Sequence, residues 1–446
     1  MNTYWCEQAW LGPDGAADGV VITVEADSIT TVEAGVPSPP AGAVRLDGVT
    51  IPGIANAHSH AFHRALRGRT HGDGGTFWTW RDQMYRLAGS LDPDSYEELA
   101  TATFAEMVVS GYTAVGEFHY LHHGPGGVPY ADPNEMGRRL LIAAARAGIR
   151  ITLLDTCYLH GGIGQTLNDV QRRFSDGSAV AWGERVGSLE GTGTGRVGAA
   201  IHSVRAVDPE SIAVVAGWSA EHAAALHAHV SEQPRENEEC LEVFGCTPVE
   251  LLSRGGALSD RFTAVHATHV SEVDVRLLAS TGSRCCMCPT TERDLADGIG
   301  PTAALRNAGV ELCIGSDSHA VIDPFEETRA IELDERLASL RRGTHQPAEL
   351  LTAATMHGYA SLGWKGGVLA PGFLADFVTV GFDSPRLAGA DRTDIAAAIA
   401  FGATASDVRH VVVGGENIVQ AGVHQDVDVV PALDSSIRAA WQAVES

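Results

Sequence analysis

The stretch Pro52-Gly53-Ile54-Ala55-Asn56-Ala57-His58-Ser59-His60 joins an apolar strand pattern to two histidines that are separated by one residue. Side chains two positions apart in an extended chain point to the same side, so both imidazoles can reach one ion. A lone His-x-His is as easily a coincidence of loop histidines, because histidine serves many purposes in proteins. The pair therefore becomes informative only if further ligands follow strands that lie beside it.

Strand and helix patterns alternate between residues 49 and 319. Short apolar or β-branched runs predict eight strands, at Gly48–Ala57, Thr113–Phe118, Arg150–Thr156, Arg196–Ile201, Ala224–Val230, Phe262–Ala267, Ser283–Cys288 and Val310–Gly315. Helices are predicted between most of them, for example at Pro93–Ser110, Pro133–Gly148, Pro209–His222, Ser271–Thr281 and Thr302–Gly309. Such alternation indicates a parallel sheet, and eight repeats fit a closed (β/α)8 barrel, with a doubly wound open sheet as the alternative.

Histidine and aspartate follow four of these predicted strands. His58 and His60 follow the first strand, His229 ends the fifth, His266 ends the sixth and Asp317 follows the eighth. Barrel enzymes build their active sites at this C-terminal rim, which favours the barrel over the open sheet. Any one of these residues could be an ordinary polar group at a strand end. Together they predict a metal site held by His58, His60, His229 and Asp317.

Three imidazoles and one carboxylate suit Zn²⁺, with Fe²⁺ or Mn²⁺ as less favoured alternatives. Such an ion lowers the pKa of a bound water towards neutrality and so supplies hydroxide. We expect His266 and Asp317 to flank this water, with one or both of them accepting its proton. Glu232, three residues after His229, is placed to carry protons to the leaving group. The predicted catalytic residues are therefore Glu232, His266 and Asp317.

The two ends of the chain have a different character from the middle. Residues 1–48 and 365–430 are rich in Val, Thr and Gly, which is typical of short antiparallel strands with turns. We expect both ends to form one small β-sandwich domain beside a barrel over residues 49–364. A C-terminal helix is predicted over residues 431–446.

Composition excludes some classes of partner. The net charge of −25 argues against binding to nucleic acid or to an anionic membrane surface. The first residues lack the pattern of a signal peptide, and no apolar run reaches the roughly 18 residues that a membrane helix needs. A cytoplasmic location is therefore expected, and the eight cysteines are expected to be reduced. We interpret Cys285-Cys286-Met287-Cys288 as a buried strand rather than a zinc site.

The barrel, the flanking β domain and the stretch from Pro52 to His60 resemble the amidohydrolase superfamily. The segment His229-Val230-Ser231-Glu232 resembles its mononuclear deaminase branch, which cleaves C–N bonds and releases ammonia. Binuclear members of the superfamily bridge two ions with a carbamylated lysine on a middle strand. The single lysine of this chain, Lys365, lies beyond the eighth predicted strand, so the resemblance implies one metal ion.

A finer resemblance is to the formimidoylglutamate deiminases. It rests on five segments, which are His58-Ser59-His60-Ala61-Phe62 with Arg64-Ala65, Phe77-Trp78-Thr79-Trp80-Arg81 with Met84-Tyr85, Glu117-Phe118-His119-Tyr120-Leu121-His122, Ala200-Ile201-His202-Ser203-Val204-Arg205-Ala206-Val207 and Cys288-Pro289-Thr290-Thr291-Glu292. Other deaminases of the superfamily share the metal ligands but not these segments. The resemblance implies hydrolysis of N-formimino-L-glutamate to N-formyl-L-glutamate and ammonia, as in histidine degradation, by a homodimer.

The substrate of those enzymes carries two carboxylates. The resemblance places Arg81, Tyr120, His202 and Arg205 around it, and arginine forks and neutral donors are suited to binding carboxylates. Arginines near the site would also oppose the acidic charge of the whole chain. Many members carry Gln where this chain has His63, and both residues can donate a hydrogen bond to a carboxylate. A related acidic formimino amino acid, such as formiminoaspartate, is therefore an alternative substrate.

Two other functions are compatible with the same scaffold. A deaminase of guanine or of a thioadenosine would require aromatic stacking partners and few arginines. We interpret Trp78 and Trp80 instead as packing in a loop that covers the site. A non-catalytic scaffold would not be expected to keep every metal and proton-transfer position, and this chain has all of them.

Overall fold

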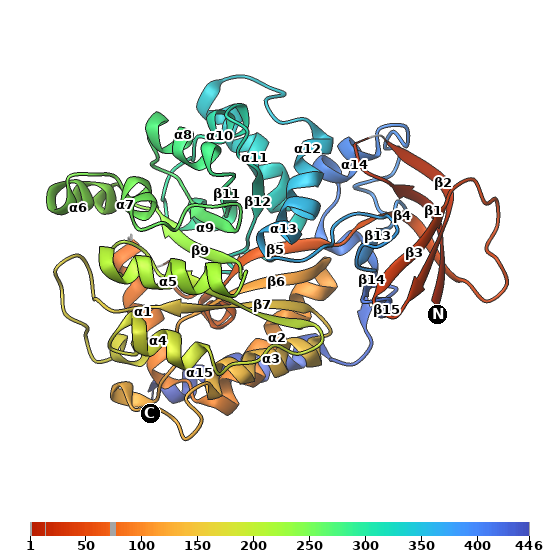
Figure 1. Cartoon of the computed structure of the whole chain (residues 1–446). Coiled ribbons are helices and arrows are strands. Elements are labelled where there is room, and N and C mark those ends of the chain that lie inside the picture. Colours follow the sequence, from red (N-terminus) through yellow and green to blue (C-terminus); the bar gives the residue numbers. More distant parts are fainter. Residues whose placement is uncertain (1, 14, 72–76, 446) are drawn as a thin grey trace.

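The computed structural model of the protein describes residues 2–13, 15–71 and 77–445. The side chain of Trp78, which was expected to pack over the site, lies outside the described part of the chain. Two sheets of eight strands organise the described residues. One sheet forms the barrel, and the other forms a β domain at one end of it (Figure 1).

The barrel sheet consists of parallel strands that follow one another in sequence order. They are β5 (Ile54–Ser59), β6 (Tyr112–His119), β7 (Arg150–Cys157), β8 (Gly195–Ile201), β9 (Leu226–Val230), β10 (Phe262–His266), β11 (Arg284–Met287) and β12 (Leu312–Ile314). The ring closes at the C-terminal rim. There the N–H of Asp317 donates to the carbonyl of His58 (3.0 Å), and the N–H of His60 donates to the carbonyl of Asp317 (3.2 Å). The predicted (β/α)8 barrel is confirmed.

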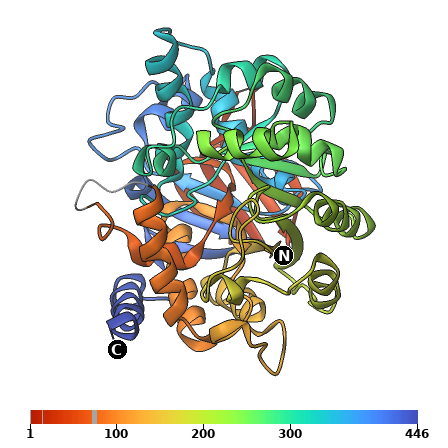
Figure 2. The same cartoon turned by 90° about the vertical axis from the view of Figure 1, so that its left-hand side faces the viewer.

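Helices surround the barrel strands, as the view along the barrel in Figure 2 shows. They are α1 (Phe77–Ser90), α2 (Pro93–Ser110), α3 (Glu135–Ala147), α4 (Ala179–Val186), α5 (Pro209–Glu221), α6 (Pro234–Phe244), α7 (Pro248–Arg254), α8 (Glu272–Ser280), α9 (Pro289–Asp294), α10 (Thr302–Asn307) and α11 (Pro324–Ser339). The start of α2 shows why Asp-Pro marks a helix. The side chain of Asp92 accepts a hydrogen bond from the N–H of Ser95, and Pro93 occupies the first turn.

Both ends of the chain contribute strands to the β domain. The strands are hydrogen-bonded into one continuous sheet in the order β16-β15-β14-β13-β4-β1-β2-β3. Its strands are β1 (Asn2–Trp10), β2 (Ala16–Glu25), β3 (Ser28–Glu33), β4 (Val44–Pro52), β13 (Phe377–Val380), β14 (Val408–Val413), β15 (Glu416–Gln420) and β16 (Val423–His424). The N-terminal and C-terminal parts meet where β4 runs antiparallel to β13. The expected β domain built from both ends is therefore present.

The prediction of one strand over Gly48–Ala57 was wrong, because these residues belong to two strands. Its first part belongs to β4 in the β domain, and its second part belongs to β5 in the barrel. A Cβ atom at Gly53, between the two strands, would lie 2.4 Å from Oγ1 of Thr113 and 2.8 Å from Oη of Tyr359. The chain passes from one sheet to the other where only glycine fits. A continuous apolar run hides this change of sheet from sequence analysis, since both strands are buried.

The C-terminal helix α15 (Val429–Glu445) starts slightly before the predicted helical region and includes its residues 431–445, and residue 446 lies outside the described part of the chain. It packs against α1 and α2 of the barrel (Figure 1). The indole N–H of Trp441 donates to the carbonyl of Ala65 (2.8 Å) and so fastens the helix to the segment that follows β5. None of the helices in the described residues is both long enough and apolar enough to cross a membrane.

Each of the eight cysteines is buried with a free thiol. Cys286, Cys288 and Cys313 pack with Ala57 and Val265 in one apolar cluster. Burial raises the pKa of Cys286 and Cys288 well above the ordinary value for a thiol, which keeps them protonated. Residues 285–287 lie in a buried barrel strand, as predicted, whereas Cys288, which the prediction included, is buried just beyond the strand at the start of α9.

Candidate active site

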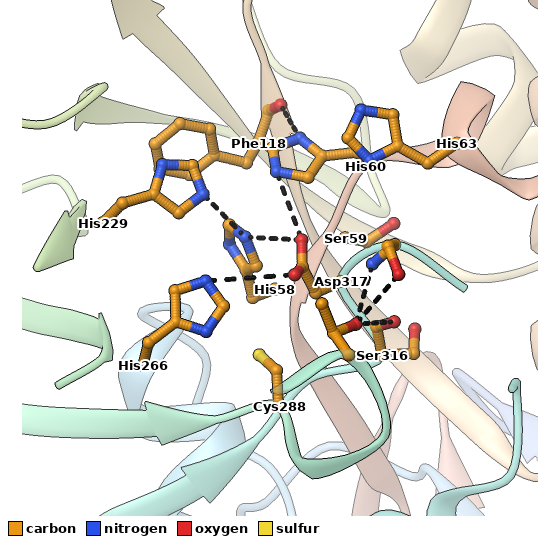
Figure 3. A network of polar contacts seen from close by, with 12 residues as sticks. His58, Ser59, His60, His63, Phe118, His229, His266, Cys288, Ser316 and Asp317 are labelled. Atoms are coloured by element: carbon orange, nitrogen blue, oxygen red, sulfur yellow. Dashed lines mark hydrogen bonds and ion pairs between the residues drawn. The ribbon is translucent and has the colours of Figure 1, made fainter. Parts of the chain in front are cut away.

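Four of the predicted ligands converge at the C-terminal rim of the barrel (Figure 3). Nε2 of His58 lies 3.1 Å from Nε2 of His229 and 3.3 Å from Oδ1 of Asp317. Nε2 of His60 lies 3.4 Å from the same carboxylate oxygen. All four side chains are buried, and their ligand atoms lie within 4.8 Å of one another. Residues far apart in the sequence are thus brought to one point, which has the size of a metal site.

The imidazole rings are oriented by backbone carbonyls outside this cluster. Nδ1 of His60 lies 2.9 Å from the carbonyl of Phe118, and Nδ1 of His229 lies 2.9 Å from the carbonyl of His202. A carbonyl only accepts, so each Nδ1 carries the proton and each Nε2 offers its lone pair to the cluster. Burial also lowers the pKa of His58 and His229 well below the ordinary value for histidine. Neutral imidazoles and one carboxylate are a donor set that fits a divalent cation.

The backbone is strained where it delivers these side chains. Asp317, His266 and Ser231 have φ angles of 39°, 69° and 51°, in the left-handed region that residues other than glycine rarely adopt. Each such residue costs on the order of 1–3 kcal/mol and is kept only where the surroundings hold it. The two backbone hydrogen bonds between Asp317 and the end of β5 provide such a constraint. Strain of this kind gathers at functional sites.

The predicted proton-transfer residues surround the same space. Nε2 of His266 lies 3.9 Å from Oδ2 of Asp317 and 3.9 Å from Oε1 of Glu232. Burial disfavours the imidazolium form of His266, but a hydrogen bond to Glu292 and the charges of Glu232 and Asp317 raise its pKa to about 10. This imidazole therefore lies between two carboxylates, beside the four candidate ligands.

A pocket opens onto this cluster, since His60, His229, Glu232 and Asp317 lie in its wall. All of the residues predicted to bind substrate also line it, namely His63, Arg81, Tyr120, His202 and Arg205. The pocket therefore joins the candidate metal site to the two predicted arginines, to a third arginine, Arg235, and to several neutral polar groups. It is the kind of concave site, with a few convergent polar groups, that takes a small molecule.

Two of these polar groups are hydrogen-bonded to each other. Nε2 of His63 lies 2.8 Å from the hydroxyl oxygen of Tyr120, and both side chains are buried. Burial lowers the pKa of His63 well below the ordinary value, and it has the same effect on His202. These imidazoles are therefore neutral and can each offer one donor and one acceptor.

Arg205 has a partner that the sequence did not suggest. Its Nη2 donates to Oε2 of Glu232 (2.8 Å), and its Nε lies 3.8 Å from Oε2 of Glu236. Glu236 lies in the first turn of α6, whereas Glu232 precedes that helix, so no helical spacing in the sequence indicated that they would share Arg205. Burial raises the pKa of Glu236. The guanidinium expected to bind substrate thus also contacts the expected proton carrier.

Sequence analysis missed most of the apolar wall of the pocket. The aromatic rings of Tyr158 and Phe174 lie 5.5 Å apart, and the ring of Phe174 lies 4.9 Å from that of Tyr120. Tyr158 follows β7 in a loop and Phe174 ends a short 3-10 helix (Gln171–Phe174), so no periodic pattern marks either residue as buried. Tyr85 was quoted within a family segment but had no assigned position, and it too lines the pocket.

A second group of histidines lies on the same rim. His119, His122 and Asp155 are buried with their ligand atoms within 4.8 Å of one another. Arg185 donates to Asp155 through Nη2 (2.8 Å) and through Nη1 (2.9 Å), so a cation already occupies that carboxylate. The group is therefore a buried hydrogen-bonding network rather than a second metal site.

Comparison with known proteins places the chain in a family. A model described as "Amidohydrolase family" matches residues 49–418, which is most of the chain. The chain belongs to the amidohydrolase family. As a member of this family the protein is a hydrolase, as the sequence predicted.

Individual relatives agree with this family assignment. The chain is 37% identical over 439 residues to formimidoylglutamate deiminase of Pseudomonas aeruginosa, covering 95% of this chain and 96% of that protein. It is 30% identical over 380 residues to a 5-methylthioadenosine/S-adenosylhomocysteine deaminase of Natronomonas pharaonis, with coverage of 83% and 81%. The crystal structure of an amidohydrolase from Brucella melitensis superposes with a TM-score of 0.89 at 33% identity, covering 100% and 99% of the two chains. Both the family and the fold are thereby established.

Proposed function

We propose that this amidohydrolase converts N-formimino-L-glutamate to N-formyl-L-glutamate and ammonia. The observation that carries the proposal is the composition of the pocket, in which Arg81, Arg205 and neutral donors face the cluster of histidines and Asp317. Such a pocket suits a substrate that has carboxylates at one end and a hydrolysable C–N bond at the other. The 37% identity to a formimidoylglutamate deiminase supports the same reaction.

In this proposal His58, His60, His229 and Asp317 hold one divalent ion, with Zn²⁺ favoured and Fe²⁺ as the alternative. The ion, when bound, would supply a nucleophile by lowering the pKa of a water. The four side chains fit it through their converging Nε2 atoms and the one carboxylate. The carbonyls behind His60 and His229 keep those nitrogens directed at the ion.

Three residues would move protons. Asp317 and His266 hold the attacking water, since their side chains lie side by side in the cluster. Asp317 accepts its proton, because the raised pKa of His266 favours the imidazolium form, which donates a hydrogen bond to the water but cannot take a further proton. Glu232 then delivers protons to the nitrogen that leaves as ammonia. Nε2 of His266 lies 3.9 Å from a carboxylate oxygen of Asp317 and 3.9 Å from one of Glu232, so a proton has a short path between them. Collapse of the tetrahedral carbon breaks the C–N bond and leaves the formyl amide.

Substrate carboxylates would be bound by Arg81 and Arg205, with His63, Tyr120 and His202 as neutral donors. A carboxylate that binds Arg205 competes with Glu232, which is paired with this guanidinium at 2.8 Å. Substrate binding would thus weaken the Arg205–Glu232 pair when the proton carrier is needed. The arginines that line the pocket also oppose, at short range, the net charge of −25.

Replacing Arg205 or Arg81 with methionine tests this assignment. Each variant is expected to lose about 10- to 100-fold in kcat/KM for N-formimino-L-glutamate, because a charged hydrogen-bonding partner of a carboxylate is worth about 1.5–3 kcal/mol. The measurement is ammonia release in a coupled assay. Arg138→Met is a matched control. Arg138 lies on α3, pairs with Asp132 and does not line the pocket. Wild-type kinetics in both pocket variants would contradict the proposed substrate class.

The aromatic wall of the pocket supports a second candidate. Tyr120, Tyr158 and Phe174 could stack on a purine, and one relative is named as a deaminase of methylthioadenosine and S-adenosylhomocysteine. An ammonia-release assay with N-formimino-L-glutamate, formiminoaspartate, guanine and methylthioadenosine separates these cases. Turnover of a purine alone would favour the second candidate, and no turnover of any compound would favour a non-catalytic scaffold. The predicted homodimer and cytoplasmic location stay predictions.

A further inference from the structure

The segment Cys288–Glu292 contacts the active site, although no function was assigned to it from the sequence. It follows β11 and forms the first part of α9. Glu292 is buried, and its Oε1 accepts a hydrogen bond from the N–H of Cys288 (2.9 Å). The same oxygen lies 3.4 Å from Nδ1 of His266. This oxygen of Glu292, which the backbone N–H of Cys288 holds in place, therefore faces the ring of a proposed proton-transfer residue.

This contact determines which nitrogen of His266 faces the reaction space. A carboxylate oxygen accepts hydrogen bonds, so Nδ1 of His266 must be the donor. Nε2 then points at the carboxylates of Glu232 and Asp317, at 3.9 Å from each. Within the described residues, Nε2 has no hydrogen-bond partner of its own. It is thus the atom available to a water or to a substrate.

The backbone alone would not hold this ring in place. His266 has a φ of 69° and the following residue, Ala267, has a φ of 51°, so the end of β10 is strained. Such a strained backbone persists only where the surrounding structure holds it. Glu292 can hold the ring, because it is tied to the N–H of Cys288 rather than free to follow the imidazole.

The same segment also contacts the loop that carries Asp317. The hydroxyl of Thr291 accepts a hydrogen bond from the N–H of Ser318 (3.1 Å) and lies 3.1 Å from its hydroxyl oxygen. The segment Cys288–Glu292 therefore links His266, at the end of β10, to the loop after β12 that carries Asp317. This arrangement resembles the use of a carboxylate to orient a histidine in other hydrolytic sites.

We propose that Glu292 is a positioning residue that holds His266 with Nδ1 protonated and Nε2 directed into the reaction space. The proposal rests on the proposed function for its kinetic part. The state of the His266 ring does not depend on the substrate, so it can be measured separately. A merely structural Glu292 would stabilise the turn at Cys288 without controlling that ring.

Nitrogen NMR of ¹⁵N-histidine-labelled protein loaded with Zn²⁺ tests the ring directly, with His266→Gln used to assign the signals. The wild-type protein is expected to show a protonated Nδ1 at His266. Glu292→Gln keeps an acceptor oxygen and is expected to keep that pattern. Glu292→Met has a similar shape without an acceptor, and its His266 signals are expected to shift towards the other tautomer or a mixture.

Kinetics provide the second measurement. Glu292→Met is expected to lose about 10- to 100-fold in kcat with little change in KM, and Glu292→Gln is expected to lose less. Glu327→Gln is the matched control, because Glu327 is a buried carboxyl group that accepts from the N–H of Thr290 in the same segment (3.0 Å). It is expected to leave the His266 signals unchanged.

Wild-type His266 signals in Glu292→Met would overturn the proposal, even if that variant were less stable. Changed signals without activity on any substrate would instead count against the proposed function.

Discussion

Replacing Glu232 with glutamine is expected to lower kcat by about 1000-fold while the protein stays folded and keeps its metal. The reason is that glutamine can still accept a hydrogen bond from Arg205 but can no longer deliver or receive a proton. A positioned general acid–base group contributes about 10²- to 10⁴-fold to a rate. Glu232 is also the carboxylate that lies 3.9 Å from Nε2 of His266, so its loss interrupts the proposed path of the proton.

Steady-state ammonia release together with metal content per chain measures this effect. Glu238→Gln is the matched control, because Glu238 is an exposed glutamate on α6, the helix that begins just after Glu232. The control should show wild-type turnover. Near-normal turnover in Glu232→Gln would remove this residue from the mechanism. Loss of the metal in the same variant would instead make Glu232 a ligand.

Replacing Asp376 with asparagine is expected to lower the free energy of unfolding by about 3–5 kcal/mol, because it leaves a buried guanidinium without its counter-ion. Oδ2 of Asp376 accepts from Nε of Arg150 (2.6 Å) and from the hydroxyl of Tyr359 (2.7 Å). Its Oδ1 accepts from the N–H of Gly414 (2.7 Å). These bonds join β7 of the barrel to the β domain, so the loss is expected to loosen the contact between the two sheets.

Chemical denaturation of the two proteins measures the difference. Asp383→Asn is the control, because Asp383 is exposed and pairs with Arg409 at the surface (2.9 Å). Surface pairs contribute little to stability, so this control is expected to unfold close to the wild type. An Asp376→Asn protein that is as stable as the control would show that the Arg150–Asp376 pair does not hold the sheets together.

The candidate metal site could be predicted from the sequence because strand order alone determines it. In a closed barrel the end of the first strand lies beside the end of the eighth, so His58 and Asp317 had to be neighbours if the barrel formed. The hydrogen bond from the N–H of Asp317 to the carbonyl of His58 shows that the ends of these two strands are neighbours. No knowledge of side-chain packing was needed.

Contacts between loops could not be predicted in the same way. Glu292 was quoted within a family segment, but its contact with His266 depends on how α9 leaves β11, which no periodic pattern reports. The pairing of Arg205 with Glu232 depends on the approach of two loops after neighbouring strands. Such contacts depend on how the loops pack in the folded protein, and local sequence patterns carry no information about this packing. The same holds at Gly53, where the chain changes sheet within one apolar run.

Anomalous diffraction from crystals of the zinc-loaded protein is the measurement that tests the central claim most directly. The expected result is one strong peak in each chain, at about 2.0–2.2 Å from Nε2 of His58, His60 and His229 and from a carboxylate oxygen of Asp317. A peak outside this cluster, a second peak of equal strength, or no peak at saturating zinc would contradict the claim that these four side chains hold a single cation.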